Sequence, residues 1–163
     1  MTNKLTQQQI LFFKSLSSYI DKPLYFYGSI LRNDYFNGKS DIDVVVFTDN
    51  DKSTISKLSL FLNVETNQFR NFISKHYSNY KINKGKKVEY QNNFVNAEIS
   101  IISEKDKNTF IELHSHKIPV YISILLIILK FLYYQLKIIP EADYKIYKHK
   151  LLHGNKDIFF VKL

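Results

Sequence analysis

Apolar side chains recur at helical spacing near the start of the chain. Thr6 is placed to cap a helix, and Gln9 lies where it would complete a capping box with Thr6. The apolar positions that follow are three or four residues apart, at Ile10, Phe13, Leu16 and Ile20. This pattern predicts an amphipathic helix that ends before Pro23, because proline cannot continue a helix.

Two strands separated by turns are predicted next. The segment from Leu24 to Tyr27 reads as a short strand that runs into Gly28-Ser29, and residues 30–33 read as the first turn of a helix. After a turn at 37–40, the strand at 41–47 ends in four apolar residues in a row. A strand that is apolar on both faces is typical of the centre of a sheet.

The middle of the chain is predicted to contain two helices and a hairpin. The first helix carries apolar residues from Ile55 to Leu62 and is capped by Ser53 or Asp51, and a second helix covers 66–77. A basic turn at 81–87 then leads to strands at 88–90 and 94–102. The Asn92-Asn93 pair between these strands indicates a hairpin turn.

The last third is predicted to be helical at 106–114, 119–139 and 142–152, and residues 158–161 fit a final edge strand. Residues 120–129 are almost entirely apolar, but a membrane span needs about 20 such residues. Ser123, Lys130 and Lys137 recur every seven residues and place a polar stripe along this helix. The stripe favours a buried amphipathic helix over a membrane segment.

These elements predict an α+β fold with a small mixed sheet, flanking helices and a C-terminal helical segment. A length of 163 residues fits a single domain, with a core at about 1–104 and a helical extension at about 105–163. The hydrophobic content of 45% supports a packed core. The first residues lack the basic and apolar regions of a signal peptide, so we expect an intracellular (cytoplasmic) protein with no membrane partner.

Composition also restricts the chemistry and the partners. The chain has no cysteine, so a metal must be held by carboxylates, histidines or backbone oxygens, and a hard cation such as Mg²⁺ suits those ligands. The net charge of +8 favours a polyanionic partner such as RNA. Lysines and tyrosines are interleaved at 80–90 and 144–150, which fits single-stranded nucleic acid as well as it fits solvated surface.

One segment carries a specific chemical pattern. Gly28 lets the backbone approach a phosphate, and the Ser29 hydroxyl and the amides that follow can bind its oxygens. Asp41 and Asp43 are two residues apart on a strand, so both carboxylates point to one face, where they can share divalent cations. The pattern predicts a site for a metal-bound phosphate.

Gly28-Ser29, eleven intervening residues and Asp41-Ile42-Asp43 together resemble the signature of the nucleotidyltransferase superfamily, which includes DNA polymerase beta and poly(A) polymerases. The resemblance implies a palm-like core and in-line transfer of a nucleotide from a nucleoside triphosphate to an acceptor hydroxyl. It also implies two Mg²⁺ (or Mn²⁺) ions about 3.5 to 4 Å apart, held by Asp41 and Asp43. The resemblance is close over residues 24–47, reaches Ile102 loosely and thins beyond that point.

The family places a third carboxylate on a neighbouring strand. Glu98 fits best, because it lies in a longer and more apolar strand than its rival Glu89. Many members of the family have aspartate at this position. Arg32, three residues after the serine, can brace the triphosphate or the Gly-Ser turn, or lie on a helix surface. Lys130 can contact the triphosphate, although the solvent-facing side of its helix is its default position.

Other polar groups suggest less. Glu112, His114 and His116 alternate, but no further histidine or cysteine completes a metal-binding spacing, so solvated or locally hydrogen-bonded side chains are favoured.

From the resemblance and the charge, we expect a template-independent nucleotidyltransferase that acts on an RNA or other nucleic-acid 3′ end. Two alternatives stay open: an enzyme that modifies a protein or small molecule, as nucleotidyltransferase antitoxins do, and an inactive nucleotide- or protein-binding module.

Overall fold

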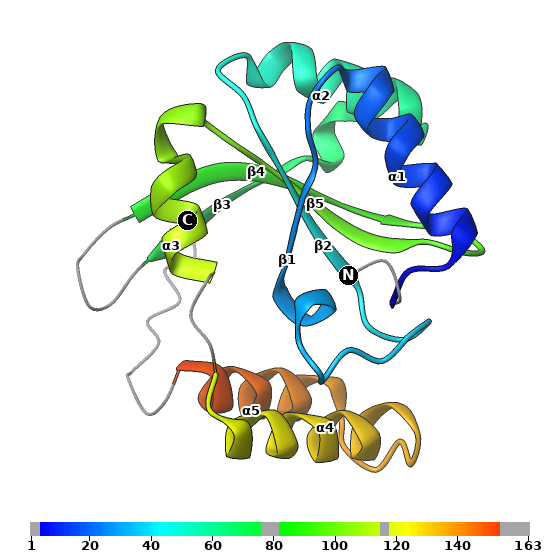
Figure 1. Ribbon diagram of the computed structural model, residues 1–163, viewed down its shortest axis with the longest axis vertical. Coiled ribbons are helices and arrows are strands. Elements are labelled where there is room, and N and C mark those ends of the chain that lie inside the picture. The colour runs from blue at the N-terminus through cyan, green and yellow to red at the C-terminus, as the bar shows by residue number, and fades with distance from the viewer. Residues whose placement is uncertain (1–3, 76–81, 115–117, 154–163) are drawn as a thin grey trace. The chain divides into compact units, whose positions relative to one another are not determined.

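A computed structural model of the chain describes residues 4–75, 82–114 and 118–153 and divides into two compact units, Met1–His116 and Lys117–Leu163. Five strands of the first unit form one sheet in the order β1-β2-β5-β4-β3 (Figure 1). β2 and β5 run parallel, and the other neighbouring strands are antiparallel. The strands are β1 (Tyr25–Tyr27), β2 (Ile42–Phe47), β3 (Arg70–Lys75), β4 (Ile82–Gln91) and β5 (Asn96–Ile102). This architecture confirms the predicted mixed sheet with flanking helices.

Local sequence signals account for the first elements. Helix α1 (Gln7–Ile20) begins with the predicted capping box, in which the Thr6 hydroxyl accepts from the Gln9 backbone N–H and the Gln9 side chain accepts from the Thr6 N–H. β1 and β2 lie within one residue of the predicted strands. The hairpin between β4 and β5 is also confirmed, because the Asn92 side chain accepts hydrogen bonds from the backbone N–H groups of Phe94 and Val95.

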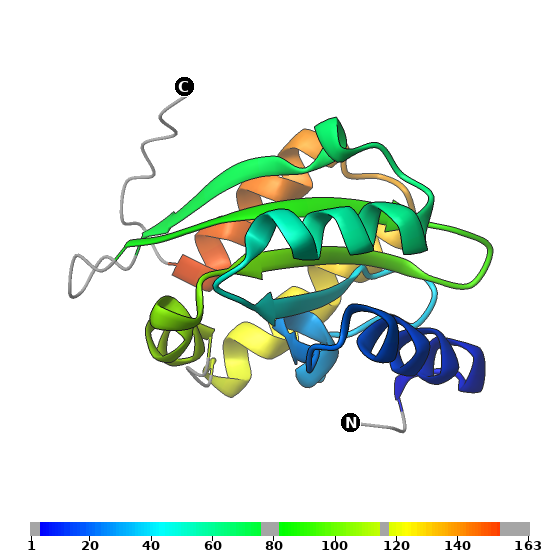
Figure 2. The same ribbon diagram turned by 90° about the horizontal axis from the view of Figure 1, so that it is seen from above.

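Two helices cover one face of the sheet. α1 and α2 (Asp51–Leu62) lie side by side there, as Figures 1 and 2 show from two directions. Their apolar sides pack against the alternate residues of β2, β5 and β4 that point to this face. The buried residues of this core include Phe13, Leu16, Ile55, Leu58, Val44, Val46, Ile99, Ile101 and Val88. This core fixes which side chains of β2 and β5 must point to the opposite face.

The opposite face of the sheet is covered by a smaller apolar cluster. Helix α3 (Lys107–His114), which follows the 3₁₀ turn η4 (Glu104–Asp106), places Phe110 against Val45, Phe47 and Ile102. These strand residues lie toward the carboxyl ends of β2 and β5. Polar residues occupy the same face toward the amino ends of the two strands.

The predicted helix at 66–77 is wrong. The chain forms the 3₁₀ turn η3 (Thr66–Gln68) and then the edge strand β3, while residues 76 and 77 lie outside the described residues. Phe72 packs into the cluster around Phe110, whereas Ile73 is exposed on the other face of the strand. The spacing of these residues fitted a helical stripe, but pairing of β3 with β4 decides the structure.

Three smaller expectations also differ from the structure. The lysines expected in a basic turn lie within β4 itself, except Lys81, which is outside the described residues. Helix α2 is capped by Asn50, whose side chain accepts from the Ser53 N–H. The helical turn expected at 30–33 is instead the 3₁₀ helix η2 (Gly28–Leu31), which starts two residues earlier.

The second unit contains two helices, α4 (Val120–Tyr134) and α5 (Glu141–His153). They contact each other partly through stacked rings of Tyr133 and Tyr144, whose centroids are 4.2 Å apart. α4 ends five residues before the predicted boundary, and Lys137 beyond it adopts a left-handed conformation with φ 54°. The edge strand expected at 158–161 lies outside the described residues.

The apolar character of α4 raises the question of a membrane span. In the parts of the chain that the structure describes, no helix has both the length and the hydropathy needed to cross a bilayer. α4 itself has 15 residues.

Candidate active site

Four polar residues from neighbouring strands lie in one row across the sheet. Tyr27 of β1 is paired with Asp43 of β2, Asp43 with Glu98 of β5, and Glu98 with Glu89 of β4. Residues paired in this way point to the same face, and neighbouring strands are about 4.8 Å apart. Glu98 therefore lies on the strand next to Asp43, whereas Glu89 lies one strand farther away.

The Gly28-Ser29 turn lies directly beside Asp43. Gly28 begins η2 with φ 71°, and a β-carbon there would overlap Oδ2 of Asp43 and lie 2.9 Å from its Cγ. The sequence pattern predicted a glycine that lets a phosphate approach. The structure adds a second requirement, because any side chain at position 28 would displace the Asp43 carboxylate.

Ser29 follows with a hydroxyl that the fold does not use. The residue is 4% exposed, and its Oγ has no hydrogen-bond partner in the part of the chain that the structure describes. A buried hydroxyl without a partner is unfavourable, and such groups are rare in folded proteins. An anionic oxygen bound at this turn would satisfy it.

Negative charge is concentrated around this row. Burial raises the pKa of the Tyr27 hydroxyl well above its ordinary value, and the charges of Asp43, Glu98 and Asp41 raise it further. The pKa of Tyr35 is raised by burial and by Asp41 and Asp43. Both tyrosines therefore stay neutral beside the carboxylates. Such a concentration of carboxylates is complementary to a cation.

Tyr27 also connects the row to helix α3. Its hydroxyl shares a hydrogen bond of 3.2 Å with Ser100 Oγ, and its ring makes edge contacts with Phe110 and His114. His114 stacks on Phe110, and its Nδ1 lies 2.9 Å from the Phe110 carbonyl oxygen. Sequence reasoning missed Tyr27, because nothing in the strand pattern marks its hydroxyl as special.

Glu98 has a cationic partner. Lys87 Nζ donates to Glu98 Oε2 at 2.6 Å, and the two side chains are 32% and 22% exposed. Sequence reasoning also missed Lys87 as a member of the site. The hairpin register that brings Lys87 diagonally across from Glu98 would have been the signal.

Arg32 is engaged close to the turn. Its Nε and Nη2 donate to the two oxygens of Asp34 at 2.8 and 3.1 Å, and Asp34 is fully buried. The Arg32 backbone is also held, because its N–H donates to Ser29 O and its carbonyl accepts from Lys4 Nζ. Arg32 thus braces the segment after the Gly-Ser turn, and Asp34 is a partner that sequence reasoning did not identify.

Other residues singled out in the sequence belong to other elements. Lys130 is in α4 of the second unit and is 1% exposed, so its default position on a solvent-facing side is wrong. Glu112 is exposed on α3, and His116 lies outside the described residues. Within the described residues, the structure contains no group of three or more histidine or carboxylate side chains that are close enough together to hold a metal ion.

The carboxylates of the row, together with Asp41 just before β2, still fit a hard divalent cation. Asp41, Asp43 and Glu98 offer carboxylate oxygens, which Mg²⁺ and Mn²⁺ prefer over nitrogen or sulfur. The glycine turn and the unsatisfied Ser29 hydroxyl are complementary to a phosphate that accompanies such an ion. In the structure, Glu98 is paired with Lys87, and among the described residues the three carboxylates do not form a ready metal-binding group.

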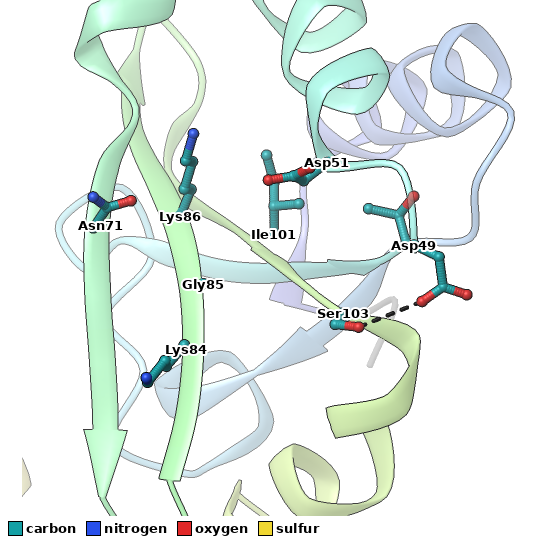
Figure 3. Close-up of a pocket in the computed structure, with 9 residues that line it drawn as sticks. Asp49, Asp51, Asn71, Lys84, Gly85, Lys86, Ile101 and Ser103 are labelled. Carbon is teal, nitrogen blue, oxygen red and sulfur yellow. Dashed lines mark hydrogen bonds between the residues drawn. The ribbon is translucent and has the colours of Figure 1, made fainter.

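A cavity of about 350 Å³ lies at a different place in the first unit (Figure 3). It is lined by residues that follow β2 and β5, including Asp49, Asp51 and Ser103, and by Lys84 and Lys86 of β4. Thr48 in its wall is five residues beyond Asp43, or about 16 Å along an extended strand. None of the sequence-predicted site residues lines this cavity.

The predicted basic clusters are divided by the structure. Lys84 and Lys86 point to the face of the sheet that carries α2, whereas Lys87 points to the carboxylate face. Tyr80 and Lys81 lie outside the described residues. On α5, Lys145 is paired with Glu141, and Lys148 lies over the Tyr144 ring. The described lysines of β4 therefore do not form one continuous patch within the first unit.

A family model described as "Nucleotidyltransferase domain" matches residues 7–148 of the chain. No curated protein matches the sequence. Among solved structures, the Cid1 poly(U) polymerase is 13% identical with a TM-score of 0.41, over 80% of this chain and 42% of that one. A cytoplasmic RNA terminal U-transferase is 14% identical with a TM-score of 0.45, over 83% of this chain and 43% of that one.

A third solved structure, the non-canonical poly(A) polymerase complex GLD-2–GLD-3, is 15% identical with a TM-score of 0.42, over 94% of this chain and 56% of that one. This chain thus spans roughly two fifths to just over half of the length of these three structures.

Proposed function

The chain belongs to the nucleotidyltransferase domain family, and from this premise we propose that it transfers a nucleoside monophosphate from a nucleoside triphosphate to an acceptor hydroxyl. The favoured acceptor is the 3′ end of an RNA or other nucleic acid, extended without a template. The observation that carries the proposal is the arrangement in which Gly28 abuts Asp43 and Asp43 is paired with Glu98.

The residues of the proposed site have distinct roles. The Gly28 backbone and the Ser29 hydroxyl bind the triphosphate, and that hydroxyl is available because it has no hydrogen-bond partner among the described residues. Asp41, Asp43 and Glu98 hold two divalent ions, Mg²⁺ or Mn²⁺, which activate the acceptor hydroxyl and neutralise the leaving pyrophosphate when bound. Arg32 braces the turn through Asp34, and it can reach a phosphate through its remaining guanidinium nitrogen.

The neutral Tyr27 completes the floor of the site. Its hydroxyl is fixed by Ser100, and its ring separates the carboxylates from the apolar cluster around Phe110. Because its pKa is raised, Tyr27 adds no negative charge to the row. Tyr27 therefore lines the site beside Asp43 and does not compete with the carboxylates for a cation.

The acceptor is proposed from charge. The net charge of +8 favours a polyanion, and basic side chains such as Arg70 and Lys87 lie on the same face of the sheet as the carboxylates. An RNA strand that approaches along this face from the β3 edge of the sheet would meet Arg70 before it meets the carboxylates. A neutral small-molecule acceptor would not need these basic side chains.

The test incubates the full chain with Mg²⁺ or Mn²⁺ and each labelled nucleoside triphosphate, with RNA, DNA or cell-extract protein as separate acceptors. An Asp41→Ala/Asp43→Ala double variant is the inactive control, and Asp49→Ala/Asp51→Ala, at the separate cavity, is the matched control for lost charge. We expect the unmodified chain to label RNA. The Asp41→Ala/Asp43→Ala variant should not label it, and the Asp49→Ala/Asp51→Ala variant should. Label that survives in the first double variant would refute the two-metal proposal, and transfer to protein alone would refute the RNA acceptor.

A further inference from the structure

The Lys87–Glu98 ion pair occupies the side chain that the proposed function needs as its third metal ligand. Glu98 lies in register between Asp43 and Glu89, so three carboxylates stand side by side on adjacent strands. Like charges placed directly opposite each other on a sheet repel. Lys87, two positions before Glu89 on β4, supplies the positive charge that compensates this repulsion.

The surroundings of Lys87 direct its ammonium toward Glu98. Directly across the sheet, Lys87 is paired with Arg70 on one side and with Ser100 on the other. The Arg70 side repels the ammonium, and the Ser100 hydroxyl already shares a hydrogen bond with Tyr27. The ammonium is bound to Glu98, and the 2.6 Å distance between Nζ and Oε2 is at the short end for a charge-assisted hydrogen bond.

We propose that Lys87 is a positioning residue that competes with the divalent cation for Glu98. This inference rests on the proposed function, because it takes Glu98 to be a metal ligand. Without metal, Lys87 neutralises Glu98 and holds it away from Asp41 and Asp43, in agreement with the lack of a ready three-carboxylate site among the described residues. Binding of the ion at Glu98 releases the ammonium, which then stands beside Arg70 at the edge of the site.

Competition between Lys87 and the metal ion for Glu98 predicts that loss of the lysine charge increases metal affinity. A partly exposed ion pair contributes modestly, so its removal should change metal affinity by a small factor. Lys87→Met keeps most of the side-chain length but removes the charge. We expect it to bind Mn²⁺ about two- to fivefold more tightly than the unmodified chain. Lys87→Arg keeps the ion pair and should bind Mn²⁺ no more tightly than the unmodified chain.

The experiment titrates the full chain with Mn²⁺ alone and measures free Mn²⁺ by electron paramagnetic resonance, with no nucleotide present. Lys86→Met is the matched control, because Lys86 is the preceding residue on β4 and points to the other face of the sheet. Its Mn²⁺ affinity should equal that of the unmodified chain. Thermal unfolding of every variant without metal confirms that each one folds.

A second comparison separates competition for Glu98 from a general effect of charge. In a Glu98→Gln background, Lys87→Met should give less than half of the gain that it gives alone. An equal gain in that background would overturn the proposal, as would an unchanged or weaker Mn²⁺ affinity of Lys87→Met, or no Mn²⁺ binding by any variant. Nucleotide transfer by the unmodified chain is scored separately, so failure of the proposed function and failure of this inference give different results.

Discussion

Gly28 lies against Asp43 so closely that a β-carbon at position 28 would overlap the Asp43 carboxylate. The contact joins the turn that begins η2 to the first residue of β2 that pairs with β1. A phosphate bound at the turn would therefore lie beside the carboxylate that we propose as a metal ligand. The glycine serves two functions here, backbone conformation and direct approach of Asp43.

Replacement of Gly28 by alanine is expected to damage both stability and activity. The left-handed conformation at φ 71° costs about 1–2 kcal/mol for a residue with a β-carbon, and displacement of Asp43 adds to that. Gly38 provides a matched control, because it has the same φ of 71° but an added β-carbon would meet nothing within 4 Å. We expect Gly38→Ala to show only the conformational cost in urea unfolding, and Gly28→Ala to unfold more easily and to lose nucleotide transfer. Equal effects of the two variants would contradict the contact with Asp43.

Ser29→Ala is expected to separate binding from stability. Because Ser29 Oγ is buried without a hydrogen-bond partner among the described residues, its removal should leave the free energy of unfolding unchanged or raise it by about 1 kcal/mol. Nucleoside triphosphate affinity, measured by calorimetry, should fall because the phosphate loses a donor. Ser40→Ala is the control: Ser40 is also buried, but its Oγ accepts from the Phe36 N–H at 3.2 Å. This variant should lose about 1 kcal/mol of stability. A stability loss in Ser29→Ala as large as that in Ser40→Ala would show a structural role.

Much of the fold follows from signals that are local in the sequence. The Thr6–Gln9 capping box, the β-strand before Gly28 and the apolar run of β2 each depend on a few adjacent residues, so the pattern predicts them directly. β3 was not predicted, because Phe72 and Ile73 sit on opposite faces of an edge strand while their spacing also fits a helical stripe. Pairing with β4, a contact between distant parts of the chain, decides between the two.

The site shows the same division. The spacing of Gly28, Ser29, Asp41 and Asp43 identifies the segment, and the register of β2 and β5 then places Glu98 next to Asp43. The Lys87–Glu98 ion pair depends on the register of the β4–β5 hairpin and on side-chain geometry, neither of which the strand pattern specifies. The Arg32–Asp34 pair depends on how the segment after η2 turns back on itself.

Substitution of the two glutamates should show which one is the third carboxylate. Glu98 is on the strand adjacent to Asp43, and Glu89 is one strand farther away and exposed. We expect Glu98→Gln to reduce the rate of transfer by about a hundredfold, the scale of losing one group that stabilises charge in a transition state. Glu89→Gln should change the rate by less than about threefold. Steady-state transfer assays at saturating Mg²⁺ test this, and the reverse order would assign the role to Glu89.

Stability should also depend on pH through His114. Burial of the His114 ring removes it from water and lowers its pKa below the ordinary value of 6.5. The folded state therefore binds a proton at His114 less readily than the unfolded chain does. The stability that the neutral His114 contributes to the folded state is fully present above the unfolded pKa. It is lost as the pH falls from about 6.5 through the lower, folded-state pKa. The unmodified chain should therefore lose more unfolding free energy between pH 7.5 and pH 5 than His114→Gln, which cannot take up that proton. His149, whose pKa is also lowered by burial, is present in both proteins, so the difference between the two pH profiles reports on His114. Parallel profiles from urea unfolding would show that His114 titrates alike in the folded and unfolded states.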